Sequence, residues 1–377
     1  MSHPPLDVEI VVDQLRRSVP GGIGTYCRGL LAGLASLDVE ERPKVTLRAS
    51  RARRKTDGVD PLSELGWPIR ISMLPGPVLT RRWDRGLPVG WLHPDVSAVV
   101  HATSIAAPPV RGETLVVMVH DLAWRRFPEA YPARGRQWHE SALQRVASRA
   151  SAFVVPSALT AADLLGAGLR IGADQVHVIP EGVDHLDPPD ERSALALLGH
   201  LGLASGADYL LTVSTLEPRK NLERLIEAYS KIRESLPEPW PLVIVGPRGW
   251  GDHPGLATQS AGVLFAGRVA GGTLSSLFSR ARAVAYVPLF EGFGLPAGEA
   301  MASGVPVVAT AGLPSASGAA LEVDPLDTEA IADGLLRACT DGSERDSLVA
   351  AGLRRASEFT WRESAARHVE IWQEVAA

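Results

Sequence analysis

The stretch Glu291–Glu299 places two carboxylates eight positions apart, with glycines and a proline between them. An apolar run, Ala283–Leu289, precedes this stretch, and another, Val305–Ala309, follows it. The pattern predicts a strand, a tight loop, a short helix and a strand, with the loop at the carboxyl end of a parallel strand. Ligands bind at that edge, and carboxylates there suit hydroxyl groups. A purely structural alternative is that the carboxylates only cap the helix.

A second pair with possible chemistry is cationic. Arg219 and Lys220 follow the apolar run Tyr209–Val213 and precede a helical pattern over Leu222–Ile232. A cation at the start of a helix opposes the helix dipole, which disfavours a purely structural role. Preorganised cations stabilise the negative charge of a departing diphosphate in a transition state. The alternative is an ordinary solvated Arg–Lys pair on the surface.

A third strand end in the same half of the chain is rich in glycine. The apolar run Leu242–Val245 leads directly into Gly246–Gly251, where a ligand can approach the backbone closely. The carboxyl ends of parallel strands lie along one edge of a sheet. The sequence therefore predicts one site that combines cations, bare backbone and carboxylates, the groups that suit a sugar nucleotide.

Two histidines end predicted strands in the first half of the chain. The runs Val96–His101 and Leu115–His120 both read as strands, and Asp121 follows the second histidine directly. Side chains at the carboxyl ends of parallel strands face the ligand crevice. We therefore expect His120 in a substrate cleft, and assign His101 and Asp121 more weakly to acceptor binding.

The first glycine cluster also opens a helix. The strand Val8–Val12 is followed by Gly21, Gly22 and Gly24, and a helical apolar pattern begins at Tyr26. The spacing differs from G-x-G-x-x-G, which argues against a dinucleotide oxidoreductase. These glycines serve either a tight turn or the close approach of a phosphate or substrate.

Strand and helix patterns alternate along the whole chain, which predicts doubly wound α/β domains. The first half ends after the strand Val176–Pro180, and His185–Asp190 reads as a linker. We place the domain boundary after residue 187. Further helices are predicted over Arg134–Ala150, Leu335–Leu353 and Trp361–Val375.

The composition is that of a folded protein with ample core, at 45% apolar and 21% charged residues in 377. The net charge of −5 argues against a nucleic-acid-binding protein. Cys27 and Cys339 match no metal or redox spacing and are expected as buried thiols. The N-terminus lacks a signal-peptide pattern, and no apolar run approaches the ~20 residues of a membrane span. We therefore expect a cytoplasmic protein.

Two basic segments, Arg48–Lys55 and Arg81–Arg85, leave membrane contact open. Solvated loops are one interpretation. A peripheral contact with the anionic headgroups of the inner membrane face is the other, at up to about 1 kcal/mol per cation.

The stretch Glu291–Glu299, continued as Ala-Met-Ala-Ser-Gly-Val-Pro-Val-Val, closely resembles the E-x7-E signature of family 4 glycosyltransferases. These are retaining enzymes of the GT-B fold. Ser214–Leu222, Val119–Leu122, Val178–Asp184 and Gly21–Gly24 also match that family, in the same order. The resemblance covers nearly the whole chain.

The resemblance implies two Rossmann-like domains with a cleft between them: an acceptor-binding domain over 1–187 and a donor-binding domain over 188–359. A last helix, 360–377, would cross back to the first domain. It implies no metal and no cofactor besides the nucleotide-diphosphate sugar as co-substrate. The catalytic residues implied are His120, Arg219, Lys220 and Glu291. The donor-binding residues implied are Gly22, Gly24, Ser214, Gly246, Arg268, Val269, Phe293, Gly294, Leu295 and Glu299.

The motifs His120–Trp124, Phe127–Glu129 and Glu217–Asn221 look most like the mannosyltransferase branch, so GDP-mannose is the expected donor. The acceptor would be a sugar, a lipid-linked sugar or a natural product. Competing hypotheses are a sugar-nucleotide epimerase, a glycosyl phosphorylase and a non-catalytic partner subunit of the same fold. The chain departs from the family at Glu181, where relatives usually have Asn, at Gly298, and in a shortened segment over 311–320.

Overall fold

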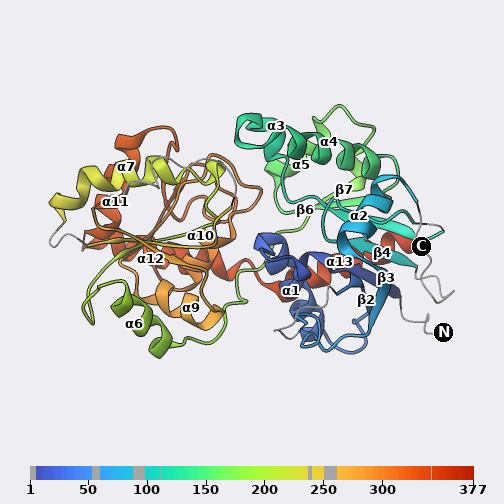
Figure 1. The fold of residues 1–377 in the computed structure, drawn as a ribbon, viewed down its shortest axis with the longest axis horizontal. Coiled ribbons are helices and arrows are strands. Elements are labelled where there is room, and N and C mark those ends of the chain that lie inside the picture. The colour runs from blue at the N-terminus through green and yellow to red at the C-terminus, as the bar shows by residue number, and fades with distance from the viewer. Residues whose placement is uncertain are drawn as a thin grey trace. The chain divides into compact units, whose positions relative to one another are not determined.

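The protein was analysed as a computed structural model, which describes residues 6–52, 60–87, 98–110, 112–236, 240–249, 261–340 and 342–377. The chain divides into two compact units (Figure 1). Unit 1 comprises Met1–Arg125, Ala133–Gly182 and Thr360–Ala377, and unit 2 comprises Arg126–Pro132 and Val183–Phe359. The main division follows Gly182, just before the predicted linker His185–Asp190 and five residues before the boundary placed after residue 187. Each unit is built around its own parallel sheet.

Unit 1 contains a seven-stranded sheet in the order β3-β2-β1-β4-β5-β6-β7, and all of its neighbouring strands are parallel. The strand order reverses between β1 and β4, which is the switch point where doubly wound sheets bind ligands. The predicted doubly wound α/β fold is therefore confirmed for this unit. Its strands are β1 Asp7–Val11, β2 Lys44–Arg51, β3 Ile69–Pro75, β4 Val99–Ala102, β5 Thr114–Met118, β6 Ala152–Val155 and β7 Val176–Val178.

Most helices of unit 1 lie between consecutive strands of its sheet in the chain. Ser157 caps one of them, α5, by accepting the N–H of Thr160. The helices are η1 Asp13–Arg16, α1 Gly21–Ser36, α2 Gly76–Asp84, α4 Ala133–Ala147, α5 Ala158–Leu165, η3 Ala173–Gln175 and α13 Trp361–Ala376, with α3 Ala123–Arg126 at the unit boundary.

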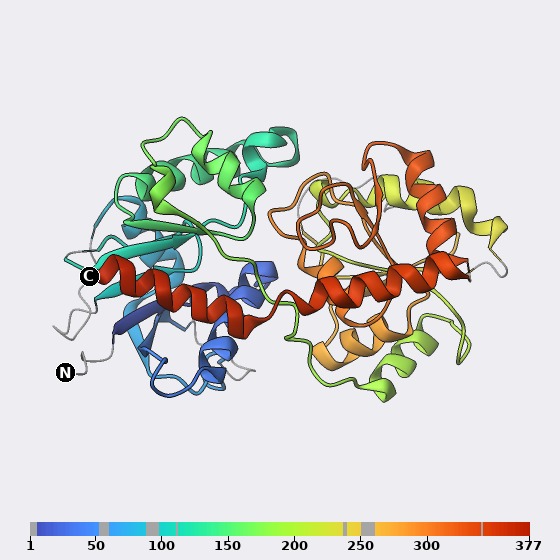
Figure 2. The ribbon, with the colours of Figure 1, turned by 180° about the vertical axis from the view of Figure 1, so that it is seen from behind.

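The last helix, α13, returns to unit 1, where it packs on α1 and near β4 and β5 (Figure 2). Two glycines of α1 allow this close approach. A Cβ atom at Gly29 would lie 2.0 Å from the ring of Trp361, and one at Gly33 would lie 2.1 Å from its carbonyl oxygen. The C-terminal helix expected to join the first domain is thus confirmed.

Unit 2 contains a six-stranded parallel sheet in the order β10-β9-β8-β11-β12-β13. Its switch point lies between β8 and β11. Both faces of the sheet are buried: Leu210 belongs to one apolar cluster and its neighbour Leu211 to the other. The strands are β8 Leu210–Val213, β9 Leu242–Val245, β10 Val263–Gly267, β11 Ala283–Tyr286, β12 Val307–Thr310 and β13 Leu321–Val323.

The helices of unit 2 include one that the sequence reading missed, α6, which Asp190 caps by accepting the N–H of Ser193. The helix predicted over Leu335–Leu353 is wrong in extent. It is two helices, because Gly342 takes a φ of 136° that breaks the run. The helices are η2 Pro128–Ala130, α6 Glu191–His200, η4 Pro218–Lys220, α7 Leu222–Ile232, η5 Arg233–Ser235, α9 Gly271–Arg280, α10 Leu295–Ala302, α11 Thr328–Cys339 and α12 Ser343–Ser357.

The predicted basic loop Arg48–Lys55 is wrong at its start, because Arg48 lies inside β2. Its guanidinium is buried against the carboxylate of Glu9 on the neighbouring strand, and Arg70 of β3 pairs with the same carboxylate. Residues 53–55 lie outside the described residues. The second basic segment lies in and just after α2, where Arg81 and Arg85 are exposed.

Cys27 and Cys339 are both buried free thiols, as predicted. Within the described ranges, no helix is at once long enough and apolar enough to cross a membrane.

Candidate active site

The cation pair lies in the loop after β8, at the switch point of unit 2. Pro218–Lys220 form a short 3-10 turn, and Asn221 takes the left-handed conformation with a φ of 59° before α7 begins. The Asn221 amide donates to the carbonyls of Val287, 3.0 Å away, and Pro325, 2.7 Å away. This anchoring holds the turn against the end of β11. Both cations lie just before the N-terminus of α7, where the helix dipole disfavours positive charge, as expected from the sequence.

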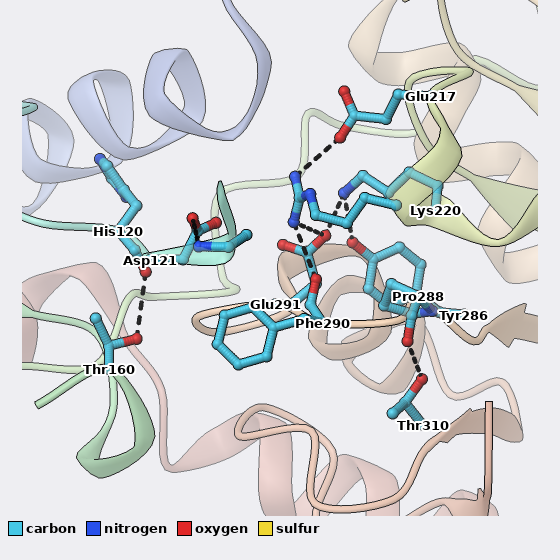
Figure 3. A network of polar contacts seen from close by, with 12 residues as sticks. His120, Asp121, Thr160, Glu217, Lys220, Tyr286, Pro288, Phe290, Glu291 and Thr310 are labelled. Atoms are coloured by element: carbon cyan, nitrogen blue, oxygen red, sulfur yellow. Dashed lines mark hydrogen bonds and ion pairs between the residues drawn. The ribbon is translucent and has the colours of Figure 1, made fainter. Parts of the chain in front are cut away.

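Arg219 and Lys220 converge on the first carboxylate of the predicted pair (Figure 3). Arg219 Nη1 donates to Glu291 Oε1 at 2.7 Å and to the carbonyl of Phe290 at 3.0 Å. Lys220 Nζ donates to the same Oε1, and also to the hydroxyl of Tyr286 at 2.9 Å. The two strand-end loops predicted to share a site are therefore brought together.

A second carboxylate, which the sequence reading did not assign, supports the pair from behind. Glu217 is 3% exposed, and its Oε1 accepts from Arg219 Nη2 at 2.9 Å. Arg219 is therefore held between Glu217 and Glu291, which fixes its guanidinium plane. The charges balance in this cluster, because two carboxylates face two cations.

Electrostatics make Glu291 a permanent anion. Burial alone would raise the pKa of its carboxyl, but Arg219 and Lys220 together hold that pKa at about 2. Burial, followed by the Glu291 charge, raises the pKa of the Tyr286 hydroxyl well above its usual value. Burial also raises the pKa of Glu217, against the opposing effect of Arg219. Glu291 is therefore a poor proton acceptor at neutral pH, and Tyr286 keeps its proton.

The glycine-rich part of the stretch turns the chain into α10. Gly294 is the N-cap, with a φ of 95° that disfavours any side chain. Ser315 holds this turn through two backbone carbonyls. Its N–H donates to Phe293 O at 3.0 Å, and its hydroxyl donates to Gly294 O at 2.8 Å. The first N–H groups of a helix have no partners within it, so this turn can meet an anion. The backbone roles predicted for Phe293, Gly294 and Leu295 stay predictions.

Glu299 lies inside α10 and is separate from the cation cluster. Its Oε1 accepts from His185 Nε2 at 3.0 Å, and the residue is 7% exposed. His185 lies in the predicted linker and was not assigned a role. Its contact orients Glu299, whose expected binding of a ribose stays a prediction.

Gly246, which directly follows β9, packs closely against the backbone of Ser214. Gly246 has a φ of 148°, and a Cβ there would lie 1.9 Å from the carbonyl oxygen of Ser214. The Ser214 hydroxyl is buried and has no hydrogen-bond partner among the described residues. Such an atom usually marks a ligand or water site. Arg268, exposed, and Val269, half-buried, follow β10, and residues 250 and 251 of the predicted loop lie outside the described residues.

In unit 1, His120 lies at the carboxyl end of the sheet, as predicted. Its Nδ1 lies 3.0 Å from Glu181 Oε1, and its Nε2 lies 3.0 Å from the carbonyl oxygen of Thr103. The Thr160 hydroxyl donates to the His120 carbonyl at 3.4 Å (Figure 3). Asp121 bends back to accept the N–H of Ala123 at 2.9 Å. Polar groups that follow β4, β5 and β7 thus meet here: a carbonyl, an imidazole and a carboxylate.

The two glycines assigned to phosphate binding lie in the first turn of α1 and have different environments. Gly24 is buried, and a Cβ there would lie 2.4 Å from Cβ of Pro20, so close packing in the first turn of the helix accounts for this glycine. Gly22 is exposed in the first turn of the helix. The phosphate contact expected for Gly22 and Gly24 stays a prediction.

The weak assignment of His101 to acceptor binding is wrong in this structure, because the residue is fully buried. Its Nε2 lies 2.8 Å from the hydroxyl of Tyr26, and its Nδ1 accepts from Trp372 Nε1 at 3.3 Å. Burial lowers the pKa of His101 well below its usual range. The side chain therefore belongs to the contact between β4 and α13.

Among the described residues, no three His, Cys, Asp or Glu side chains are grouped as metal ligands.

Comparisons with known proteins support the two-part reading of the chain. Residues 20–185 match "Glycosyltransferase Family 4", and residues 199–355 match "Glycosyl transferases group 1". The chain is 30% identical over 275 residues to O-antigen chain mannosyltransferase B of Escherichia coli. That match covers 70% of this chain and 71% of the relative.

Solved structures resemble the whole chain in fold. Sucrose-phosphate synthase from Thermosynechococcus elongatus matches with a TM-score of 0.72 at 18% identity, over 98% of both chains. Anabaena HepE in complex with UDP-glucose matches with a TM-score of 0.69 at 18% identity, over 97% of this chain and 99% of HepE. The expected GT-B fold is confirmed. The chain belongs to glycosyltransferase family 4, and it resembles the mannosyltransferase branch of that family.

Proposed function

We propose that this glycosyltransferase is a retaining, metal-independent hexosyltransferase that moves mannose from GDP-mannose to an acceptor hydroxyl. One observation carries the proposal: Arg219 and Lys220 are fixed beside Glu291 at the switch point of a doubly wound sheet. Such an arrangement combines diphosphate-binding cations with a hydroxyl-binding carboxylate. The similarity to O-antigen chain mannosyltransferase B supports mannose as the sugar.

The cations would act on the leaving group. When the bond between the anomeric carbon and the diphosphate breaks, negative charge collects on the diphosphate. Arg219 is held by Glu217 and Lys220 by Tyr286, so neither cation needs to reorganise when that charge appears. Preorganised donors of this kind commonly contribute about 3–4 kcal/mol each.

Glu291 would bind sugar hydroxyls, while its charge balances the cations before the donor arrives. The diphosphate carries more negative charge than one carboxylate, so it competes for Lys220 and Arg219. Glu291 can then accept hydrogen bonds from the sugar instead. Before the donor arrives, Arg219 and Lys220 hold the pKa of this carboxyl at about 2, so it is ionised throughout the neutral pH range.

For the transfer itself we propose a front-face route. The acceptor oxygen forms a bond to the anomeric carbon on the face that the diphosphate leaves, and the acceptor proton passes to a diphosphate oxygen. This route needs no protein nucleophile. It is supported by the two candidate side chains, since Glu291 is paired with two cations and both ring nitrogens of His120 are engaged.

The donor can be tested by thermal unfolding with GDP, UDP and ADP. A ligand at 100 times its dissociation constant stabilises the folded state by about 2.7 kcal/mol. We expect GDP to raise the melting temperature at lower concentration than UDP or ADP. Preferential stabilisation by UDP would overturn the choice of donor, and no response to any of the three would overturn the nucleotide site.

The reaction can be tested with GDP-mannose and a panel of sugar, lipid-linked and natural-product acceptors. We expect acceptor-dependent release of GDP, with a product that keeps the anomeric configuration of the donor in its NMR spectrum. Release of sugar by inorganic phosphate without an acceptor would instead indicate a phosphorylase. A covalent sugar adduct on Glu291 would overturn the front-face route.

A further inference from the structure

The charge state of His120 follows from its two hydrogen-bond partners. Nε2 faces the backbone carbonyl of Thr103, which can only accept. Nδ1 faces the carboxylate of Glu181, which also accepts when it is ionised. A ring that donates from both nitrogens carries two protons and is therefore an imidazolium cation.

Glu181 is built into unit 1 as an internal partner. It lies three residues after β7, and its side chain is 5% exposed. A buried carboxylate is stable as an ion only when it is paired. His120 lies 3.0 Å away and is 61 positions distant in sequence, so the pair exists only in the folded chain.

We propose that Glu181 is a positioning residue that holds His120 as an imidazolium with a fixed ring orientation. The ring then keeps no lone pair for a proton, so His120 serves as a fixed cationic donor and cannot act as a general base. The proposal rests on the proposed function only where it concerns turnover, since the charge state itself is a property of the folded chain.

Other titratable groups around the ring agree with this state. Burial by itself lowers the pKa of His120, but the hydrogen bond and charge of Glu181 outweigh it, and the net pKa is raised above its usual value. Asp121 acts in the same direction as Glu181, and His101 is itself kept neutral by burial. The edge of Tyr26 contacts the ring with centroids 5.1 Å apart, and burial keeps both Tyr26 and Cys27 protonated.

The Thr103 carbonyl fixes the second nitrogen independently of Glu181. The Thr103 hydroxyl donates to Val11 O at 2.7 Å, which anchors the residue to the end of β1. Replacing Glu181 by glutamine therefore leaves the ring in place and removes one charge. A glutamine side chain can still accept from Nδ1, so the variant separates charge from shape.

Histidine NMR of the full chain tests the charge state directly. With ring-labelled histidine, the His120 signal is identified as the one that His120→Gln removes. We expect an imidazolium signal at pH 7 in the natural chain. In Glu181→Gln the proton affinity of His120 should fall at least ~10-fold, the equivalent of one pH unit. Glu181→Asp keeps the charge and should restore most of the difference.

A neutral His120 signal at pH 7 in the natural chain would overturn the proposal, and so would equal titration in Glu181→Gln. A merely structural role for Glu181 would lower the melting temperature of both variants without separating glutamine from aspartate. Turnover adds a second readout: kcat of Glu181→Gln should rise toward acid pH, where the ring regains its proton. The result of this pH profile does not depend on the result of the donor test, because the variants are compared on whichever donor is active.

Discussion

The hydroxyl of Tyr26 lies 2.8 Å from Nε2 of His368, a residue 342 positions further along the chain. Nδ1 of His368 faces the carbonyl of Ser364 at 2.7 Å, so that nitrogen carries the proton and Nε2 accepts from the tyrosine. Tyr26 can then accept from His101, which accepts in turn from Trp372. All four side chains are satisfied only when both imidazoles are neutral. This relay ties α13 to α1 and β4.

Tyr26→Phe should destabilise unit 1, because it leaves His101 and His368 each with a buried nitrogen that has no partner. Leaving such groups unsatisfied costs about 1–3 kcal/mol. Urea unfolding at pH 7.5 measures the loss. The control is Thr25→Ser, at the neighbouring half-exposed position of α1. If Tyr26→Phe were as stable as this control, the hydrogen bonds of Tyr26 would not contribute to the stability of unit 1.

The relay also predicts acid sensitivity. Burial lowers the pKa of His368 to about 4, whereas histidine in the unfolded chain titrates near pH 6.5. The unfolded state therefore gains this proton first as the pH falls. The contribution of His368 is complete above about pH 6.5 and is lost toward pH 4, by about 3 kcal/mol. Unfolding at pH 7.5 and 5 should show this slope. His368→Gln should reduce the slope and leave the part due to His101, whose pKa is also lowered by burial. As a control, His200→Gln, at the exposed end of α6, should leave the slope unchanged.

Glu291→Gln should separate binding from turnover. The glutamine no longer competes as an anion for Arg219 and Lys220, so GDP should bind more tightly, by at least about 5-fold for ~1 kcal/mol of competing charge. Turnover should fall, because the sugar loses its anionic partner. Calorimetry with GDP and steady-state kinetics measure the two effects. Weaker GDP binding in this variant would contradict the charge balance described for the cluster.

Lys220→Ala should lower kcat at least ~10²-fold, as the loss of a preorganised donor does elsewhere. The matched control is Lys231→Ala on α7, whose lysine pairs at the surface with Glu329. An exposed pair of that kind contributes little to stability and has no role in the site. Equal kinetics for the two variants would exclude Lys220 from catalysis.

The strands that could be read from the sequence are those with uniformly apolar faces. Leu242–Val245 is one of these, because both sides of its sheet are covered by helices. The strand β2 was missed because Thr46, Arg48 and Ser50 interrupt its apolar pattern. Those polar residues are buried on one side, where Glu9 meets Arg48, and pairing across strands is invisible in a linear pattern.

The site residues that directly follow predicted strands could be predicted from the sequence. Arg219 and Glu291 were expected along one sheet edge, and they form an ion pair there. The groups that hold these side chains could not be found in this way. Tyr286, for example, is the last residue of an apolar strand, and nothing in the sequence distinguishes it from a core residue. His101 shows the converse error. A strand-end histidine can also turn inward, and only Tyr26 and Trp372, from distant helices, decide which way it faces.

Replacing Gly298 and Gly199 by alanine should change the stability of the protein in opposite directions. A Cβ at Gly298 would lie 2.6 Å from Val183 Cγ1, and Val183 is held in place by its hydrogen bond to the Phe359 carbonyl. Overpacking of this kind costs about 1–3 kcal/mol, more than alanine gains in a helix. At Gly199 in α6 a Cβ would meet nothing within 4 Å, so alanine should stabilise by about 0.5–1 kcal/mol.

Urea unfolding of the two single variants measures this difference, and a third variant tests its cause. Val183→Ala removes the methyl groups that Gly298→Ala would strike. The double variant should therefore lose less stability than the sum of the two single losses, because the residues are in contact. Additive losses would mean that α10 shifts away from Val183 instead. A stabilised Gly298→Ala would show that α10 has room for a side chain at this position.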